Sequence, residues 1–327
     1  MSGDTILRVR GLRTWFPIRS GLFQRVSGYV RAVDGVDLDI REGQTLALVG
    51  ESGCGKTTVG RSLLRLEEPR EGSIEFDGVN LAGLSREAMR PYRSAMQIVF
   101  QDPMASLDPR MRVRDAIAEG MQAFGIGDDE QERTERVGAL LERVQLDARQ
   151  MWRYPHEFSG GQRQRICIAR ALAVEPRLIV CDEATSALDV SIQAQILNLL
   201  RRLQDDLGLA YLFITHDLGV VRYLAHRVAV MYVGQIVEEA ETETLFSDPA
   251  HPYTQGLLAA VPSADPARRG IAARVSGDVP SPANPPPGCR FHTRCPLAFE
   301  PCATQMPELL PTATGTSRCF LAEKPEI

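Results

Sequence analysis

The sequence predicts an α/β fold built on a buried parallel sheet whose strands carry polar residues at their C-terminal ends. Three apolar runs predict it, each followed at once by polar or glycine-rich chain: Leu178–Cys181 before Asp182, Thr45–Val49 before Gly50, and Leu212–Ile214 before Thr215. Short apolar runs of this kind are typical of strands buried on both faces. Because open α/β sheets hold ligands at the carboxyl ends of their strands, we expect a ligand site at this edge.

Size and charge limit the class of protein. A chain of 327 residues is long enough for one large domain and a smaller one. Its formal net charge of −5 argues against a nucleic-acid partner, which needs a basic face. No stretch approaches 18 apolar residues, and Met1–Arg10 lacks the basic-then-apolar pattern of a signal peptide. We therefore expect a soluble, cytoplasmic chain that needs separate subunits to move anything across a membrane.

The run after Thr45–Val49 matches a phosphate-binding loop, and the amphipathic run Val59–Leu66 follows it as a helix. Glycines let backbone amides wrap around phosphates at the positive end of that helix, a lysine adds charge, and a threonine hydroxyl binds Mg²⁺. The nucleotide-binding residues expected here are Gly50, Glu51, Ser52, Gly53, Cys54, Gly55, Lys56, Thr57 and Thr58.

Three further segments point to phosphate chemistry. Asp182 is placed to hold Mg²⁺ and Glu183 to take a proton from an attacking water, although an acid pair after a strand also serves as a helix cap. Ser159 caps a helix that opens with two glycines, which predicts a second anion-binding helix end. His216 follows a strand, where a structural histidine is also common.

The remaining elements follow in order. Three alternating runs, Ile6–Leu12, Val36–Ile40 and Ser73–Asp77, predict an antiparallel sheet, with Arg19–Val30 as a loop. Met96–Phe100 predicts a strand before Gln101. Helical spacing in Val113–Gln122, Glu132–Val144 and Ile192–Leu207 predicts helices, of which the first two form an inserted helical subdomain at about 102–165. Arg227–Val233 and Gln235–Glu239 predict two closing strands around Gly234.

Taken in this order, the segments resemble the nucleotide-binding subunits of ABC transporters over residues 6–248. The resemblance rests on the phosphate loop, Gln101, the signature Phe158–Gln162, Asp182 with Glu183, Ser186–Asp189 and His216; Phe158 stands where the family usually has leucine. It implies an ABC-type P-loop ATPase with an antiparallel β subdomain, a helical subdomain and a small loop-rich C-terminal extension. The predicted domains are 1–248 for nucleotide binding and 249–327 for the extension.

The resemblance also implies a head-to-tail dimer, in which the signature residues Ser159, Gly160, Gly161 and Gln162 of one subunit close over ATP held by the other. Thr57, Gln101 and Asp182 would hold Mg²⁺, Glu183 would be the general base, and His216 would contact the γ-phosphate and the attacking water. An aromatic side chain is expected to stack on adenine. Phe16 is the choice and Tyr29 the alternative.

Residues from His251 onward resemble the extension of oligopeptide and dipeptide importer ATPases, a group that includes nickel and glutathione importers. Trp152–Glu157 resembles the importer form of the segment before the signature. We therefore expect an ATP hydrolase that powers peptide import at the cytoplasmic face of the membrane. Its expected partners are a second ATPase subunit, identical or paralogous, two transmembrane permease subunits and an external solute-binding protein. The alternatives are another solute, namely nickel, glutathione or an antimicrobial peptide, or a non-transport ABC ATPase.

Four of the seven cysteines lie close together after the proline-rich run Pro280–Gly288, which predicts an extended spacer. These are Cys289, Cys295, Cys302 and Cys319. In a reducing compartment clustered thiols favour a metal over disulfides. Ligand count favours Zn²⁺, whereas the irregular spacing also suits a [4Fe–4S] cluster. The resemblance to peptide-importer ATPases, for which such a cluster is a family feature, selects [4Fe–4S] with Zn²⁺ as the alternative. The other cysteines, Cys54, Cys167 and Cys181, are expected to be buried.

Overall fold

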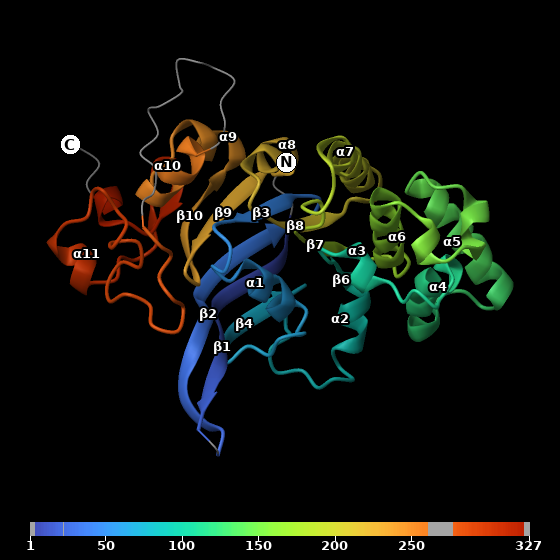
Figure 1. Cartoon of the computed structure of the whole chain (residues 1–327), viewed down its shortest axis with the longest axis horizontal. Helices are drawn as coiled ribbons and strands as arrows, with labels where there is room; N and C mark the ends of the chain where they lie inside the picture. Colours follow the sequence, from blue (N-terminus) through green and yellow to red (C-terminus); the bar gives the residue numbers. More distant parts are fainter. Residues whose placement is uncertain (1–3, 22, 261–276, 324–327) are drawn as a thin grey trace. The chain divides into compact units, whose positions relative to one another are not determined.

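The computed structural model describes residues 4–21, 23–260 and 277–323, which divide into two compact units (Figure 1). One unit comprises the described parts of Met1–Asp4, Arg41–Gln44 and Gly83–Ile214. The other comprises the described parts of Thr5–Ile40, Thr45–Ala82 and Thr215–Ile327. The first is called the signature unit and the second the phosphate-loop unit, after the motif that each contains.

The signature unit contains a parallel layer of strands and a group of helices. Its strands are β6 (Met96–Val99), β7 (Leu178–Asp182) and β8 (Ala210–Thr215, whose last residue belongs to the other unit). Strand β7 pairs in parallel with β6 on one side and β8 on the other, with Val180 opposite both Ile98 and Leu212. Its helices are α2 (Arg90–Ala95), α3 (Pro103–Ser106), α4 (Val113–Phe124), α5 (Glu130–Arg143), α6 (Gly160–Leu172) and α7 (Val190–Leu207), with the short 3₁₀ helices η1 (Ala148–Trp152) and η2 (Pro155–Glu157).

The helices predicted in this unit form close to the predicted residues. Helices α3, α4 and α5 pack with α6, which in turn packs on α7 (Figure 1). Helix α7 buries Ile196, Leu199, Leu200 and Leu203 and ends at Gly208, whose φ of 66° is left-handed, as a C-terminal glycine allows. The amphipathic spacing predicted this helix because one face must be apolar to be buried.

The phosphate-loop unit contains two sheets. The antiparallel one has the order β2-β1-β4-β5, and the other runs β11-β12-β10-β9-β3 within this unit. Strand β3 pairs in parallel with β9, whereas β9–β10, β10–β12 and β11–β12 are antiparallel. The strands are β1 (Thr5–Ser20), β2 (Arg25–Arg41), β3 (Thr45–Val49), β4 (Glu71–Phe76), β5 (Val79–Asn80), β9 (Arg227–Tyr232), β10 (Gln235–Glu241), β11 (Leu310–Pro311) and β12 (Gly315–Ser317). Its helices are α1 (Lys56–Leu63), α8 (Leu218–Leu224), α9 (Thr242–Ser247), α10 (Pro252–Ala259), α11 (Glu300–Thr304) and the 3₁₀ helix η4 (Phe320–Glu323).

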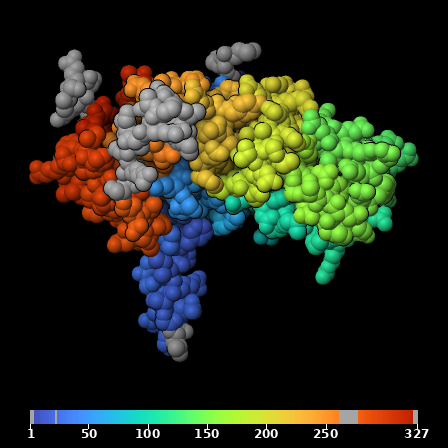
Figure 2. Space-filling model, turned by 45° about the horizontal axis from the view of Figure 1, so that its top comes forward, coloured from blue at the N-terminus to red at the C-terminus, as the bar shows by residue number. Residues whose placement is uncertain are grey.

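The prediction of a loop over Arg19–Val30 is wrong. Strands β1 and β2 run through most of this stretch and form a long arm that stands out from the rest of its unit (Figure 2). Gln24, with φ 49°, donates a backbone hydrogen bond to Gly21 at 3.1 Å and closes the turn. Because the outer part of the arm is exposed on both faces, its sequence lacks the apolar–polar alternation that marks a strand.

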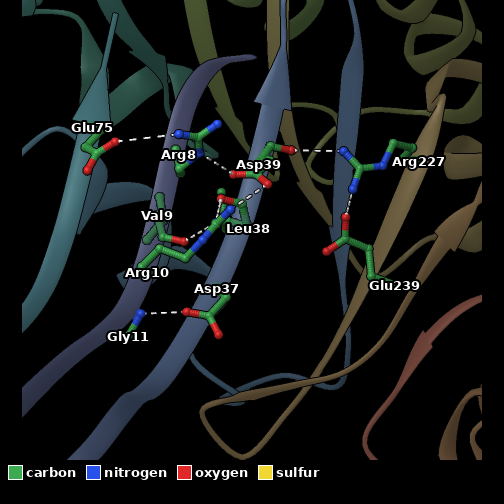
Figure 3. Close-up of polar contacts among 10 residues, drawn as sticks. All are labelled: Arg8, Val9, Arg10, Gly11, Asp37, Leu38, Asp39, Glu75, Arg227 and Glu239. Atoms are coloured by element: carbon green, nitrogen blue, oxygen red, sulfur yellow. Dashed lines mark hydrogen bonds and ion pairs between the residues drawn. The ribbon is translucent and has the colours of Figure 1, made fainter. Parts of the chain in front are cut away.

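Charged side chains join the two sheets of this unit (Figure 3). Arg10 of β1 pairs with Asp39 of β2 at 2.8 Å, and Arg8 reaches the same carboxylate at 3.8 Å. Arg227 of β9 donates to the Asp39 carbonyl at 3.1 Å and pairs with Glu239 of β10. Arg227 therefore links the antiparallel sheet to the β9–β10 hairpin.

The C-terminal residues are part of the same unit rather than an appended loop. Strand β12 extends the sheet by pairing with β10, with Thr316 opposite Glu239. Tyr253 and Phe291 lie in one buried cluster with Val49 and Val230, so the extension shares the core of the sheet that carries the phosphate loop. The stretch predicted as a spacer also contacts the sheet, because the Pro282 carbonyl accepts a hydrogen bond from the Arg31 backbone at 2.9 Å.

Candidate nucleotide-binding site

The phosphate loop lies between the fully buried strand β3 and helix α1, as the sequence predicted. Gly50 and Gly55 have φ of 152° and 109°. A Cβ atom would lie 2.2 Å from the Met231 carbonyl at Gly50 and 2.0 Å from the Ala32 carbonyl at Gly55. Glycine is therefore required at both positions because backbone from neighbouring strands approaches too closely for any side chain.

Lys56 crosses the loop. Its buried ammonium group donates to the carbonyls of Gly50 at 2.8 Å and Glu51 at 3.0 Å. These bonds hold the loop against the start of α1, where the helix dipole favours an anion. Thr57 and Thr58 follow in the first turn of α1.

His216 lies beside the loop. A pocket of about 400 Å³ is lined by Gly50 and Glu51 on one side and by His216 and Asp217 on the other. Asp217 caps α8, because its side chain accepts from the backbone of Gly219 at 2.9 Å. This cap fixes the chain immediately after His216, which is one of the residues that line the pocket.

In the signature unit, Gln101 and Glu183 meet. The Gln101 amide donates to a Glu183 carboxylate oxygen at 3.1 Å and lies 3.3 Å from the Ser186 hydroxyl. Asp182 ends β7 and is buried. Glu183 has φ 50°, an uncommon backbone conformation for a glutamate, and its backbone N–H donates to the Ile214 carbonyl at 3.0 Å. Strain of this kind persists where the surroundings impose it and is concentrated at functional sites.

The signature helix begins as predicted. Ser159 caps α6 in a reciprocal arrangement with Gln162, in which each side chain accepts from the other residue's backbone at 3.4 and 3.0 Å. Gly161 is buried, and a Cβ atom there would lie 2.5 Å from the Ile192 side chain. Gly160 is exposed and has room for a Cβ, with the nearest atom at 3.6 Å. Ser159 and Gly160 therefore present an exposed helix start.

The structure thus gathers the predicted residues into two groups. The phosphate loop and His216 lie together in the phosphate-loop unit. Gln101 lies with Glu183 in the signature unit, which also contains Asp182 and the capped start of α6. Each unit therefore contains a helix whose start carries glycine, and the signature unit also has a buried acid at the end of β7.

Phe16 and Tyr29, the two candidates for stacking on adenine, lie in different surroundings. Phe16 lies half-buried on β1. Tyr29 packs against Trp15, with ring centroids 6.0 Å apart, and the Arg70 guanidinium covers both rings at 4.8 and 4.7 Å. Neighbouring residues of a strand face opposite sides, so Phe16 and Trp15 point away from each other. The packing of Trp15 with Tyr29 and Arg70 could not be predicted, because the alternation of residues along a strand does not reveal a contact with an arginine 55 positions later.

The four clustered cysteines, Cys289, Cys295, Cys302 and Cys319, line one small pocket. Burial raises the pKa of the Cys289 thiol to about 11, with a smaller increase from the other three thiols. Even so, across residues 4–21, 23–260 and 277–323 no group of three or more His, Cys, Asp or Glu side chains is placed to hold a metal ion. The expected [4Fe–4S] cluster, or Zn²⁺, is therefore not supported as a formed site. Cys54, Cys167 and Cys181 are buried, as predicted.

Two units with these motifs define an ATP-binding cassette, and comparisons with known proteins identify the family. A family model described as "ABC transporter" matches residues 33–186, and one described as "Oligopeptide/dipeptide transporter, C-terminal region" matches residues 237–302. The chain is 52% identical to the oligopeptide transport ATP-binding protein AppF of Bacillus subtilis over 93% of each chain. It is 55% identical to the glutathione import ATP-binding protein GsiA of Salmonella paratyphi A over 86% of this chain and 45% of that protein.

Among solved structures, the dimeric ATP-binding cassette MJ0796, in a post-hydrolysis state with ADP and Pi, matches with a TM-score of 0.63 and 26% identity. The match covers 72% of this chain and 98% of that one. The chain therefore belongs to the ABC transporter family of ATP-binding subunits, and it is an ABC-type ATPase. No described helix is long and apolar enough to cross a membrane.

Proposed function

We propose that this chain hydrolyses ATP to power the import of dipeptides and oligopeptides through a partner permease. The observation that carries the proposal is the joint match to an ABC transporter model and to the C-terminal region of oligopeptide and dipeptide transporters within one chain. The name of AppF supports the same cargo. We further propose 1–248 as the nucleotide-binding domain and 249–327 as the extension.

The residues take the following roles. The amides of Gly50–Thr58 and the Lys56 ammonium bind the phosphates, and Phe16 stacks on adenine because Tyr29 is already engaged by Trp15 and Arg70. Thr57, Asp182 and Gln101 would hold Mg²⁺, which would neutralise charge on the phosphates.

Glu183 accepts a proton from the attacking water, and its hydrogen bond with Gln101 orients the carboxylate. His216 contacts the γ-phosphate from the pocket that it shares with Gly50.

ATP drives assembly in this proposal. The exposed helix start at Ser159 and Gly160 closes over ATP bound by a second ATPase subunit, identical or paralogous, and hydrolysis releases it. The dimeric form of the related cassette supports the association of two ATPase subunits. The pair acts on two membrane permease subunits at the cytoplasmic face of the membrane, and an external solute-binding protein delivers the peptide.

A second cargo, glutathione, is favoured by one observation, the 55% identity to GsiA. Reconstitution in liposomes with the two permease subunits and the solute-binding protein tests both cargoes, peptides and glutathione. Hydrolysis should be stimulated when the solute-binding protein carries a peptide. Stimulation by glutathione alone would select the second cargo, and co-purification with ribosomes or DNA in place of permeases would refute transport.

We also propose that Cys289, Cys295, Cys302 and Cys319 are the ligands of a [4Fe–4S] cluster, with Zn²⁺ as the alternative. Support comes from the one small pocket that the four side chains line, since cysteine sulfur is the ligand that both an iron–sulfur cluster and Zn²⁺ take. Anaerobically purified chain should be brown with broad absorbance. Colourless protein with about one zinc per chain would replace the cluster by zinc. Metal-free protein with four titratable thiols would refute both.

A further inference from the structure

The phosphate loop is held from outside by residues of the C-terminal extension, and Glu51 is the point of attachment. Its carboxylate receives two parallel hydrogen bonds from the Arg294 guanidinium, at 2.7 and 2.9 Å. The Arg294 side chain is only 5% exposed and that of Glu51 is 28% exposed. A paired fork of this kind fixes both position and orientation more strongly than a single contact.

Tyr253 holds the same residue through its backbone. Its hydroxyl accepts a hydrogen bond from the Glu51 N–H at 3.0 Å. The ring is fully buried and packs against Tyr232 and Phe291, with centroids 4.6 and 5.3 Å away. Burial raises the pKa of the Tyr253 hydroxyl, so it stays neutral, and Arg294 also donates to the Tyr232 hydroxyl at 3.3 Å.

A second attachment holds the far side of the loop. The Gly234 N–H donates to the Cys54 carbonyl at 2.8 Å. The turn that carries Gly234 is held by Arg290, which donates to the Val233 carbonyl and pairs with Asp34. The loop is thus fixed at Glu51 and at Cys54, in both cases with the help of an extension arginine.

Charge explains why Glu51 needs a partner. A carboxylate in a loop that binds a triphosphate repels the negative charge of that ligand unless a cation cancels it. The repulsion is stronger where solvent is partly excluded. Arg294 supplies that cation from a residue 243 positions away. The two hydrogen bonds from Arg294 neutralise the Glu51 carboxylate and keep it from turning toward the phosphates.

We propose that Arg294 and Tyr253 are positioning residues of the ATP site, so that the C-terminal extension of a subunit sets the ATP affinity of that subunit's own phosphate loop. The inference rests on the proposed function only in taking the loop as the ATP site. It assigns to the extension a role in nucleotide binding that is separate from cargo, permease contact and the cysteine pocket.

The test measures binding of a fluorescent ATP analogue and steady-state hydrolysis in the full chain. Arg294→Gln should raise the Kd for ATP about tenfold, as expected for loss of a partly buried charged pair. The Kd of Arg294→Lys should lie between those of wild type and Arg294→Gln, because lysine keeps the positive charge but cannot make the paired hydrogen bonds. Arg222→Gln on α8, whose pair with Glu243 is exposed, is the matched control and should bind like wild type.

Rescue separates compensation of the Glu51 charge from general stability. In the Arg294→Gln background, Glu51→Gln removes the uncompensated carboxylate and should restore the Kd to within about twofold of wild type. A merely structural role of Arg294 would leave the double variant as weak as the single one. Tyr253→Phe keeps the buried ring and should raise the KM for ATP severalfold with a smaller change in kcat.

Two results would overturn the proposal: wild-type affinity in folded Arg294→Gln, or no rescue by Glu51→Gln. If Arg294→Gln does not fold, an unchanged KM in Tyr253→Phe overturns it instead. Wild-type chain that binds no ATP would refute the proposed function itself. Wild-type binding that Lys56→Ala abolishes, with every Arg294 variant normal, would keep the function and reject this inference.

Discussion

His251 makes the stability of the C-terminal extension depend on pH, and His251→Asn isolates the effect. The imidazole is buried, caps α10, and accepts a hydrogen bond from the Tyr253 N–H at 3.0 Å. The backbone N–H groups of His251 and Ala250 donate to the Glu238 carboxylate at 2.9 and 2.7 Å. Asparagine keeps a capping acceptor at this position but does not titrate in this range.

The magnitude follows from the pKa of the imidazole. Burial lowers it from 6.5 to about 4, and the Arg318 backbone offsets part of that effect. Because the unfolded chain binds a proton at higher pH than the folded chain, stability is complete above pH 6.5 and is lost as the pH falls toward 4. Integrating this linkage gives a loss of about 1.4 kcal/mol at pH 5.5.

Urea unfolding followed by circular dichroism at pH 7.5 and 5.5 measures this loss. The variant is expected to be less stable at pH 7.5, because the smaller side chain leaves space in the core. The stability advantage of wild type should then shrink by about 1.4 kcal/mol at pH 5.5. A constant difference between the two proteins across this range would show that His251 is not held neutral by burial.

Further predictions concern the catalytic and signature residues. Glu183→Gln should keep ATP bound while phosphate release slows by about 10²–10⁴-fold; turnover within a few-fold of wild type would exclude Glu183 as the base. Lys56→Ala should abolish ATP binding, whereas Gly160→Asp should bind ATP yet fail to dimerise in sedimentation, and equal loss of affinity in both would contradict the head-to-tail arrangement. Gly161→Ala, which crowds Ile192, should cost about 1–3 kcal/mol in thermal unfolding, with Gly160→Ala as the unaffected control.

The local parts of the site could be predicted because their signals are local. The cap at Ser159 lies three residues from its partner Gln162, and the glycines of the phosphate loop directly follow a buried strand. In both cases the residue that needs a particular backbone conformation is adjacent in sequence to the element that imposes it. Single-residue chemistry and short spacing were therefore sufficient.

Long-range contacts could not be predicted in the same way. Pairing of Thr316 with Glu239 makes β12 part of the sheet, but a strand of three residues, Gly315–Ser317, carries no periodic signal. No short-range pattern joins Glu51 to Arg294, which lies 243 positions later. The charge of Glu51 within a phosphate-binding loop was the one available hint that a distant cation must compensate it.

Arg290 and Arg294 lie between Cys289 and Cys295 along one short segment of the extension. The two cysteines line the thiol pocket, while the two arginines reach Val233 and Glu51 on the side of the phosphate loop. Cys289 and Cys295 also pack against the core that contains Tyr253, so the thiol pocket and the two arginines belong to one packed region. In the proposal above, Arg294 and Tyr253 act on the phosphate loop from this shared region, whether or not the thiol pocket holds a metal.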